Sequence, residues 1–372
     1  MNKLRGYHLL ACITGTLVLA TAGCAHFGSQ DQFPYQAKIL LRENLECNAP
    51  GHPIDEALRC EPSGVTFSRD RIWLVNDKTI GSAPSSSILT SPFQGFRLRS
   101  VAEAKRGNPI AIGTKKWEDI DTTPNGEYLI ATTGFDRVKP DGSWDVYNRL
   151  VAWPTGRFEQ LSLVEPNSER HSVKSHVDLK QSISDLLKAH GFTQTDYFKV
   201  EGLTATNTHL LLGIREVGLN YEAFSYTITV VTIPYIIDTD GLKLIGQPQL
   251  LKTITLDQQG WGLSSLTLGH KSDMLLVLVS KEDGDKLTDL NGRLLVTTTA
   301  PGDTSYHYVR SPSGNPLEFH RKAEGITLLD GQRYLVIHDD DRRLGEATDG
   351  STRRALKEAS YDIIQFFNER SD

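Results

Sequence analysis

The chain contains no apolar run long enough to cross a bilayer, and only two methionines and four cysteines occur among its 372 residues. Its longest stretch of apolar or small residues, 9–22, is about 14 residues long, whereas a membrane-spanning helix needs roughly twenty. The composition is 38% hydrophobic and 23% charged, which is ordinary for a globular protein. A disordered polymer, a fibre and a bundle of membrane helices are therefore excluded.

An excess of basic residues is also missing, because the formal net charge is −6. Non-specific nucleic-acid binding requires a clustered basic surface, so we expect no nucleic-acid partner. The sequence has no Gly-x-Ser-x-Gly elbow, no His-Glu-x-x-His zinc motif and no phosphate-binding P-loop. The sequence therefore lacks the signatures of α/β-hydrolases, of zinc metalloproteases and of P-loop nucleotide-binding proteins.

The amino terminus has the pattern of a secretory signal. Lys3 and Arg5 precede the apolar stretch, and small residues lead to Cys24. This ending resembles the lipobox of bacterial lipoproteins, although Thr21 stands where that pattern prefers Leu. The resemblance implies a lipid on Cys24, and Ala25 after it favours the outer membrane. We predict a signal peptide over 1–23, a lipidated tether over 24–34 and a single domain over 35–372 in the bacterial cell envelope, with an ordinary cleaved signal as the alternative.

Two cysteines remain when Cys12 leaves with the signal peptide and Cys24 carries lipid. These are Cys47 and Cys60. An exported protein meets an oxidising compartment, so the pair predicts a disulfide. A metal site is the weaker alternative, because two thiolates do not complete a tetrahedral shell.

A repeated unit runs through the domain. Each copy has a short strand that is apolar or rich in glycine, a polar turn and a second apolar strand. The copies begin at Glu61, Glu118, Glu201, Trp261 and Glu324, at intervals of 57, 83, 60 and 63 residues. Four strands with their turns fit such an interval, which is the blade of a β-propeller. We therefore predict an all-β protein, a propeller of five blades, with six as the alternative.

Closure of this propeller requires a further strand in the last unit. The segment 37–42 can supply it, so we expect the amino-terminal strand to pair with the carboxy-terminal blade and to remove exposed edges. The longest interval contains an insertion in which Leu179, Ile183 and Leu187 recur at helical spacing before Gly191. This spacing predicts one amphipathic helix.

Acidic residues occupy equivalent places in the units. Glu61, Glu118, Glu201 and Glu324 open the first strands of four units, and the second strands end at Asp77, Asp136, Glu216 and Asp339. Circular symmetry would gather these acids at one mouth of a central channel. Their mutual repulsion requires cations, and Ca²⁺ suits flexible oxygen ligands. The candidate metal ligands are Glu61, Asp77, Glu118, Glu201, Glu216, Glu324 and Asp339. Alternatively, each Glu closes a blade by accepting neighbouring backbone N–H groups.

The Glu-Gly-Leu/Ile-Thr openings, followed by Leu-Leu-Gly-Ile-Arg-Glu or Leu-Val-Ile-His-Asp-Asp, resemble the phytase-like β-propeller superfamily, in particular the branch called "esterase-like activity of phytase". The resemblance covers residues 60–340. Phytases of this superfamily hydrolyse phosphomonoesters with water activated by Ca²⁺. Glu61, Glu201 and Glu324 match the openings well, Glu118 matches less well, and Trp261 replaces the acid.

Three functions are compatible with these residues. The first is a Ca²⁺-dependent hydrolase of phosphoesters or related anionic esters, with Glu201, Arg215, Glu324 and His338 in catalysis and Lys78, Arg137, Trp261 and Lys281 binding the ligand. The second is a non-catalytic binding or scaffold lipoprotein that presents a propeller face to an envelope protein or a glycan. The third is a structural lipoprotein whose channel mouth holds a stabilising ion.

Overall fold

The computed structural model describes residues 34–48, 60–77, 87–94, 97–104, 108–137, 145–166, 176–271, 273–281, 291–319, 321–339 and 358–367. The chain divides into two units, Met1–Gln32 and Phe33–Asp372, and the described residues all belong to the second. The predicted signal peptide, Cys24 and Lys78 lie outside the described residues. No helix within the described ranges is long and apolar enough to cross a membrane.

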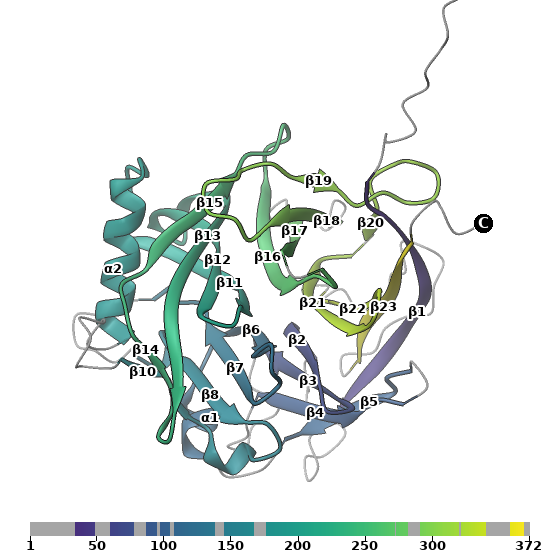
Figure 1. Cartoon of the computed structure of the whole chain (residues 1–372), viewed down its shortest axis with the longest axis horizontal. Coiled ribbons are helices and arrows are strands. Elements are labelled where there is room, and N and C mark those ends of the chain that lie inside the picture. Colours follow the sequence, from purple (N-terminus) through teal and green to yellow (C-terminus); the bar gives the residue numbers. More distant parts are fainter. Residues whose placement is uncertain are drawn as a thin grey trace, which may run out of the picture. The chain divides into compact units, whose positions relative to one another are not determined.

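The described residues of the second unit form mainly β-strands, as the sequence predicts (Figure 1). The largest sheet has the order β2-β3-β4-β5-β1-β23-β22-β21. β1 pairs with β23 in antiparallel register and with β5 in parallel register, so strands of the first and last sequence units share one sheet. The strands are β1 (Gln36–Asn48), β2 (Pro62–Ser68), β3 (Arg71–Asn76), β4 (Ile88–Pro92), β5 (Ser100–Glu103), β21 (Ala323–Asp330), β22 (Arg333–His338) and β23 (Glu358–Phe367).

Three further sheets hold the other strands of the described residues. One sheet comprises β6 (Trp117–Thr122), β7 (Tyr128–Thr133), β8 (Leu150–Pro154) and β9 (Ser162–Leu163). A second comprises β10 (Glu165–Pro166), β11 (Tyr197–Ala205), β12 (His209–Asn220), β13 (Ala223–Asp238), β14 (Gly241–Leu244) and β15 (Gln249–Ile254). The third comprises β16 (Trp261–Leu268), β17 (Met274–Lys281), β18 (Asn291–Thr298), β19 (His307–Tyr308) and β20 (Glu318–Phe319).

The second strand of each sequence unit contains a run of buried, mostly apolar residues and lies between two other strands of its sheet. Every residue of β17 from Met274 to Ser280 is buried, and β17 pairs with β16 on one side and β18 on the other. A continuous apolar run of this length is typical of a strand buried on both faces. The same pattern in β3, β7, β12 and β22 made the repeat visible in the sequence.

The first strands of the five sequence units contact one another in order. β2 contacts β6, β6 contacts β11, β11 contacts β16, β16 contacts β21, and β21 contacts β2. In Figure 1 these strands lie toward the middle of the drawing, with their partner strands outside them. Residues that open the units are therefore close to residues of neighbouring units.

Glycine near the start of three first strands permits this close approach. A Cβ atom on Gly64 of β2 would lie 2.5 Å from Asp119 Cα of β6, and one on Gly202 of β11 would lie 2.6 Å from a Leu263 methyl group of β16. A Cβ atom on Gly325 of β21 would lie 2.9 Å from Val65 N of β2. The glycines in the repeated openings therefore have a packing role between neighbouring strands.

Two α-helices occur among the described residues. α2 (His176–Ala189) is the predicted amphipathic helix, and its Leu179, Ile183 and Leu187 join a core cluster with Phe198 of β11. Gly191, with φ of +93°, follows its end. The short helix α1 (Pro109–Gly113) was not predicted; its cap is Asn108, whose side chain accepts from the backbone N–H groups of residues 110 and 111. The 3₁₀ turns are η1 (Asp145–Tyr147) and η2 (Phe158–Gln160).

A disulfide joins Cys47 at the end of β1 to Cys60 before β2, which confirms the predicted pairing. Closing a loop of this length restricts the unfolded chain, so the double change Cys47→Ala and Cys60→Ala should lower the free energy of unfolding by about 3 kcal/mol. Urea unfolding of the variant and of the unreduced wild type measures this difference. Alkylation of both thiols in unreduced, denatured wild-type protein would refute the disulfide.

Candidate functional site

A lysine precedes the opening glutamate by two residues in three sequence units. The pairs are Lys116 and Glu118, Lys199 and Glu201, and Lys322 and Glu324, and each forms an ion pair. Lys116 and Lys322 come just before β6 and β21, and Lys199 lies in β11 at an irregularity of its pairing with β12, so the contacts and not strand alternation define these pairs. Lysine two residues before the opening glutamate is therefore a sequence signal for these ion pairs.

Two of these pairs merge into one network between β6 and β11. Lys199 Nζ lies 3.4 Å from Glu118 Oε1 and also pairs with Glu201. Lys116 Nζ lies 3.6 Å from the same Glu118 oxygen and 3.3 Å from Asp77 Oδ2. Glu118 is thus held between two ammonium groups that come from different sheets.

Arg215 extends the network from β12. Its side chain is fully buried, with Nη1 3.1 Å from Glu201 Oε2 and Nε 3.7 Å from Glu216 Oε1. Nη1 also donates to the hydroxyl groups of Ser264 at 3.0 Å and Ser280 at 2.8 Å, which belong to β16 and β17. We call Asp77, Lys116, Glu118, Lys199, Glu201, Arg215 and Glu216 the first-strand network.

Burial and pairing act in opposite directions on the ionisable groups of this network. Burial raises the pKa of Glu118 to about 8, although Lys199 and Lys116 oppose the shift. Burial alone would lower the pKa of Lys199, but Glu118, Glu201 and Glu216 outweigh it and hold that pKa well above its ordinary value. Lys199 therefore stays charged at neutral pH, because the surrounding carboxylates outweigh its burial.

A pocket with a volume of 760 Å³ opens beside the network. Lys116, Lys199 and Glu216 line it together with Arg137, whose guanidinium lies 4.8 Å from the centre of the Tyr147 ring. The remaining residues come from Asp136, Asp196, Tyr197 and the β12–β13 hairpin at Leu219, Asn220, Tyr221 and Phe224. Acidic, basic and aromatic groups therefore face one space, which we call the Tyr221 pocket.

The hairpin side of the Tyr221 pocket is apolar and open. Tyr221 is 72% exposed and Leu219 is 49% exposed, so both stand among the exposed large apolar residues of the described chain. Asp136 also lines this pocket; its side chain is 9% exposed, and its Oδ1 has no hydrogen-bond partner within the described structure. A ligand entering this pocket meets an exposed ring and a nearby carboxylate.

The structure brings Asp77, Glu118, Glu201, Arg215 and Glu216 together in the first-strand network, and Arg137 lines the adjoining pocket. The other predicted acids are Glu61, Glu324 and Asp339, which make the following contacts. The backbone of Glu61 bonds to residues 76 and 77, and Glu324 pairs with Lys322 Nζ at 2.8 Å. The backbone N–H of Asp339 donates to the Lys322 carbonyl.

Three further predicted residues are His338, Trp261 and Lys281. His338 is 2% exposed, and its Nε2 lies 3.3 Å from Asp362 Oδ2 of β23. Trp261 is 6% exposed beneath the Arg293 guanidinium, which lies 4.6 Å from its ring, and it pairs in register with Lys281. None of the three lines the Tyr221 pocket, and their predicted roles in catalysis and binding stay predictions.

The donor set described here does not fit a calcium ion. Within the described ranges, no group of three or more His, Cys, Asp or Glu side chains is placed to hold a metal. The carboxylates of Glu118, Glu201 and Glu324 face lysine ammonium groups, which supply the opposing charge instead. Calcium binding is a prediction from the sequence, and the contacts described here do not depend on a metal ion.

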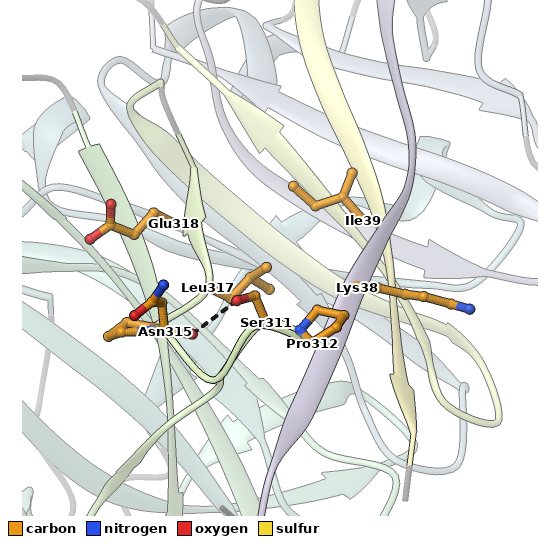
Figure 2. Close-up of a pocket in the computed structure, with 8 residues that line it drawn as sticks. Lys38, Ile39, Ser311, Pro312, Asn315, Leu317 and Glu318 are labelled. Carbon is orange, nitrogen blue, oxygen red and sulfur yellow. Dashed lines mark hydrogen bonds between the residues drawn. The ribbon is translucent and has the colours of Figure 1, made fainter. Parts of the chain in front are cut away.

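A second hollow, with a volume of 630 Å³, lies beside β1 (Figure 2). Its labelled residues come from β1, at Lys38 and Ile39, and from the segment 311–318. Ser311 Oγ donates to the Asn315 carbonyl at 3.2 Å across the turn of this segment. None of the candidate catalytic, ligand-binding or metal residues predicted from the sequence lines this hollow, so the Tyr221 pocket is the better candidate.

No family model and no curated protein matches this chain. Solved structures that match include hydrazine synthase of Kuenenia stuttgartiensis, at 9% identity and a TM-score of 0.35, over 75% of this chain and 65% of that one. The Cps50 (Swd1) β-propeller domain of Myceliophteria thermophila matches at 8% identity and a TM-score of 0.33, over 81% and 82% of the chains. The PQQ-bound aldose sugar dehydrogenase of Streptomyces coelicolor matches at 12% identity and a TM-score of 0.36, over 88% and 98%. Such low scores establish neither a shared family nor a function.

Proposed function

We propose that this chain is a lipid-anchored protein of the bacterial envelope with a five-bladed β-propeller that binds a ligand and catalyses no reaction. The cyclic contacts from β2 through β6, β11, β16 and β21 back to β2 support five blades around one axis. The β1–β23 pairing supports closure through the amino-terminal strand. The leader ending at Cys24 supports the anchor.

The ligand that fits the Tyr221 pocket best is the end of a glycan. An exposed aromatic ring offers a flat apolar surface for a sugar face, and its edge offers a hydroxyl group. Asp136, Arg137 and Asn220 bring acceptors and donors to the same pocket for sugar hydroxyl groups. A concave site with an apolar surface and a few convergent polar groups is the usual form of a binding site.

The observation that carries this proposal is the contrast between the pocket and the network beneath it. In the network, Lys116, Lys199 and Arg215 already face carboxylates at ion-pair distance, so these charges are structurally engaged. In the pocket, Tyr221 is 72% exposed. We therefore expect the exposed surface at Tyr221 to bind the ligand, while the paired charges of the network hold the strands in place.

A glycan array probed with the full chain in detergent tests this function. We expect retention of a subset of glycans, and Tyr221→Ala should weaken the affinity for a retained glycan about tenfold, because stacking area is lost. Tyr221→Phe should keep most of the affinity. Tyr306→Ala, a change of the same kind in a half-buried tyrosine outside the pocket, should bind like wild type.

Two results would contradict the proposal. The first is wild-type affinity in Tyr221→Ala for every retained glycan, which would place the site elsewhere. The second is turnover of a generic phosphomonoester that chelator abolishes and Ca²⁺ restores. That result would favour the hydrolase that the sequence resemblance implies.

A further inference from the structure

A separate pocket, with a volume of 500 Å³, lies where the first strands of the five sequence units end. Each of these strands contributes two consecutive residues to its lining. They are Phe67 and Ser68 of β2, Asp121 and Thr122 of β6, Thr204 and Ala205 of β11, Thr267 and Leu268 of β16, and Thr327 and Leu328 of β21. We call this space the Asp121 pocket. None of the residues predicted as functional from the sequence lines it.

The carboxylate of Asp121 is the acidic group of this pocket. Asp121 is 8% exposed, and it accepts hydrogen bonds from the Thr66 hydroxyl at 3.1 Å, the Thr204 hydroxyl at 2.6 Å and the Thr122 backbone N–H at 2.7 Å. A hydroxyl group that donates its hydrogen to a carboxylate keeps its own oxygen lone pairs available as acceptors. The wall beside Asp121 is therefore rich in acceptors.

The charged groups around Asp121 are few. Asp119 lies two residues earlier on β6, and it is bonded to the Leu203 backbone N–H at 2.8 Å and the Ser265 hydroxyl at 3.0 Å. Arg69 also lines the pocket, and its Nη1 donates to the Thr155 carbonyl at 3.1 Å. The lining residues from β11, β16 and β21 are uncharged. The buried carboxylate thus favours a positively charged group in the pocket.

We propose that the Asp121 pocket binds the primary ammonium group of an alkylamine or of a lysine side chain. An ammonium group has three N–H donors and no acceptor, which matches a carboxylate flanked by threonine hydroxyl groups. A divalent metal ion would need several more carboxylate or carbonyl ligands, and within the described residues no group of three acidic or histidine side chains is placed to provide them. This site is independent of the Tyr221 pocket.

Calorimetric titration of the full chain in detergent tests the proposal, with 1,4-diaminobutane and with Nα-acetyl-lysine methylamide as separate probes. We expect saturable binding of at least one probe. Asp121→Asn should weaken it at least about 30-fold, because the charge is lost. Thr267→Val, which keeps the side-chain shape, should weaken it about tenfold. Asp240→Asn, the same change in an exposed turn, should bind like wild type.

The dependence on pH adds a second readout. Burial raises the pKa of Asp121 to about 6, with hydrogen bonds from Thr204, Thr122 and Thr66 acting in the opposite direction. Both probes remain protonated below pH 8, so their affinity should fall as the pH falls through about 6 and Asp121 takes up a proton.

The probes also distinguish the two sources of the ammonium group. Binding of the diamine alone supports a free amine ligand, and binding of the lysine derivative supports a lysine of another protein. If neither probe binds, or if Asp121→Asn and Thr267→Val both bind as wild type does, the proposal is wrong. Glycan binding at the Tyr221 pocket should be unchanged in both variants, so the two proposals fail separately.

Discussion

Arg215→Met should lower the free energy of unfolding by about 3–5 kcal/mol. The side chain of Arg215 is fully buried. It pairs with Glu201 and Glu216 and donates to two serine hydroxyl groups. Methionine fills a similar volume but leaves the buried carboxylate of Glu201 without this partner. Urea unfolding followed by tryptophan fluorescence would measure the loss.

Two further variants give this prediction its control. Arg97→Met removes the pair with Glu43, whose side chains are 60% and 30% exposed, and should change the free energy of unfolding by less than about 1 kcal/mol. Adding Glu201→Gln to Arg215→Met should recover part of the loss, because the buried network then has one acidic charge fewer to balance after the loss of the guanidinium. Equal stability of Arg215→Met and wild type would show that the pairing contributes nothing.

Gly64→Ala should be the most damaging of the glycine-to-alanine changes in the repeated openings, at about 3 kcal/mol of lost stability. The added Cβ would lie 2.5 Å from Asp119 Cα, 2.7 Å from Asp119 Oδ1 and 2.9 Å from Ile120 N, all in β6. These are atoms of the backbone or of a bonded carboxylate. Displacing Asp119 would also disturb its bonds to Leu203 of β11 and Ser265 of β16.

Gly113→Ala is the matched control. Its nearest neighbour would be the Arg149 guanidinium at 3.7 Å, which is ordinary contact. Thermal unfolding should therefore show a lower midpoint for Gly64→Ala and an unchanged or slightly higher midpoint for Gly113→Ala. If both variants melt with wild type, β2 and β6 are farther apart than described here.

The comparison of sequence and structure is clearest in the opening segments. The acidic residues were visible in the sequence because they recur beside long apolar strands. Their partners in the structure include Lys116, Lys199 and Lys322, which stand two residues before Glu118, Glu201 and Glu324. Only Lys199 lies within its strand, whereas Lys116 and Lys322 come just before β6 and β21, so the spacing alone does not dictate the ion pairs. The acidic residues alone predict a metal ion, whereas in the structure the neighbouring lysines supply the opposing charge.

Other features required contacts that no local pattern contains. Helix α1 depends on a cap at Asn108 and spans only five residues, too few for an apolar period to show. The Asp121 pocket depends on the ends of five strands that are scattered from β2 to β21. A threonine at one strand end indicates no binding site in the sequence, because the pocket forms only when the ends of five strands come together.

The sequence by itself determined the strands, the amphipathic helix, the cysteine pair and the repeated openings, because each rests on residue spacing along one segment. The tertiary structure alone decided which charges meet. It placed Lys199 of β11 next to Glu118 of β6, buried Arg215 against β16 and β17, and left Tyr221 open to solvent. Pairing energies and burial depend on distances between segments that lie far apart in the chain, and such distances are set only when the sheets pack.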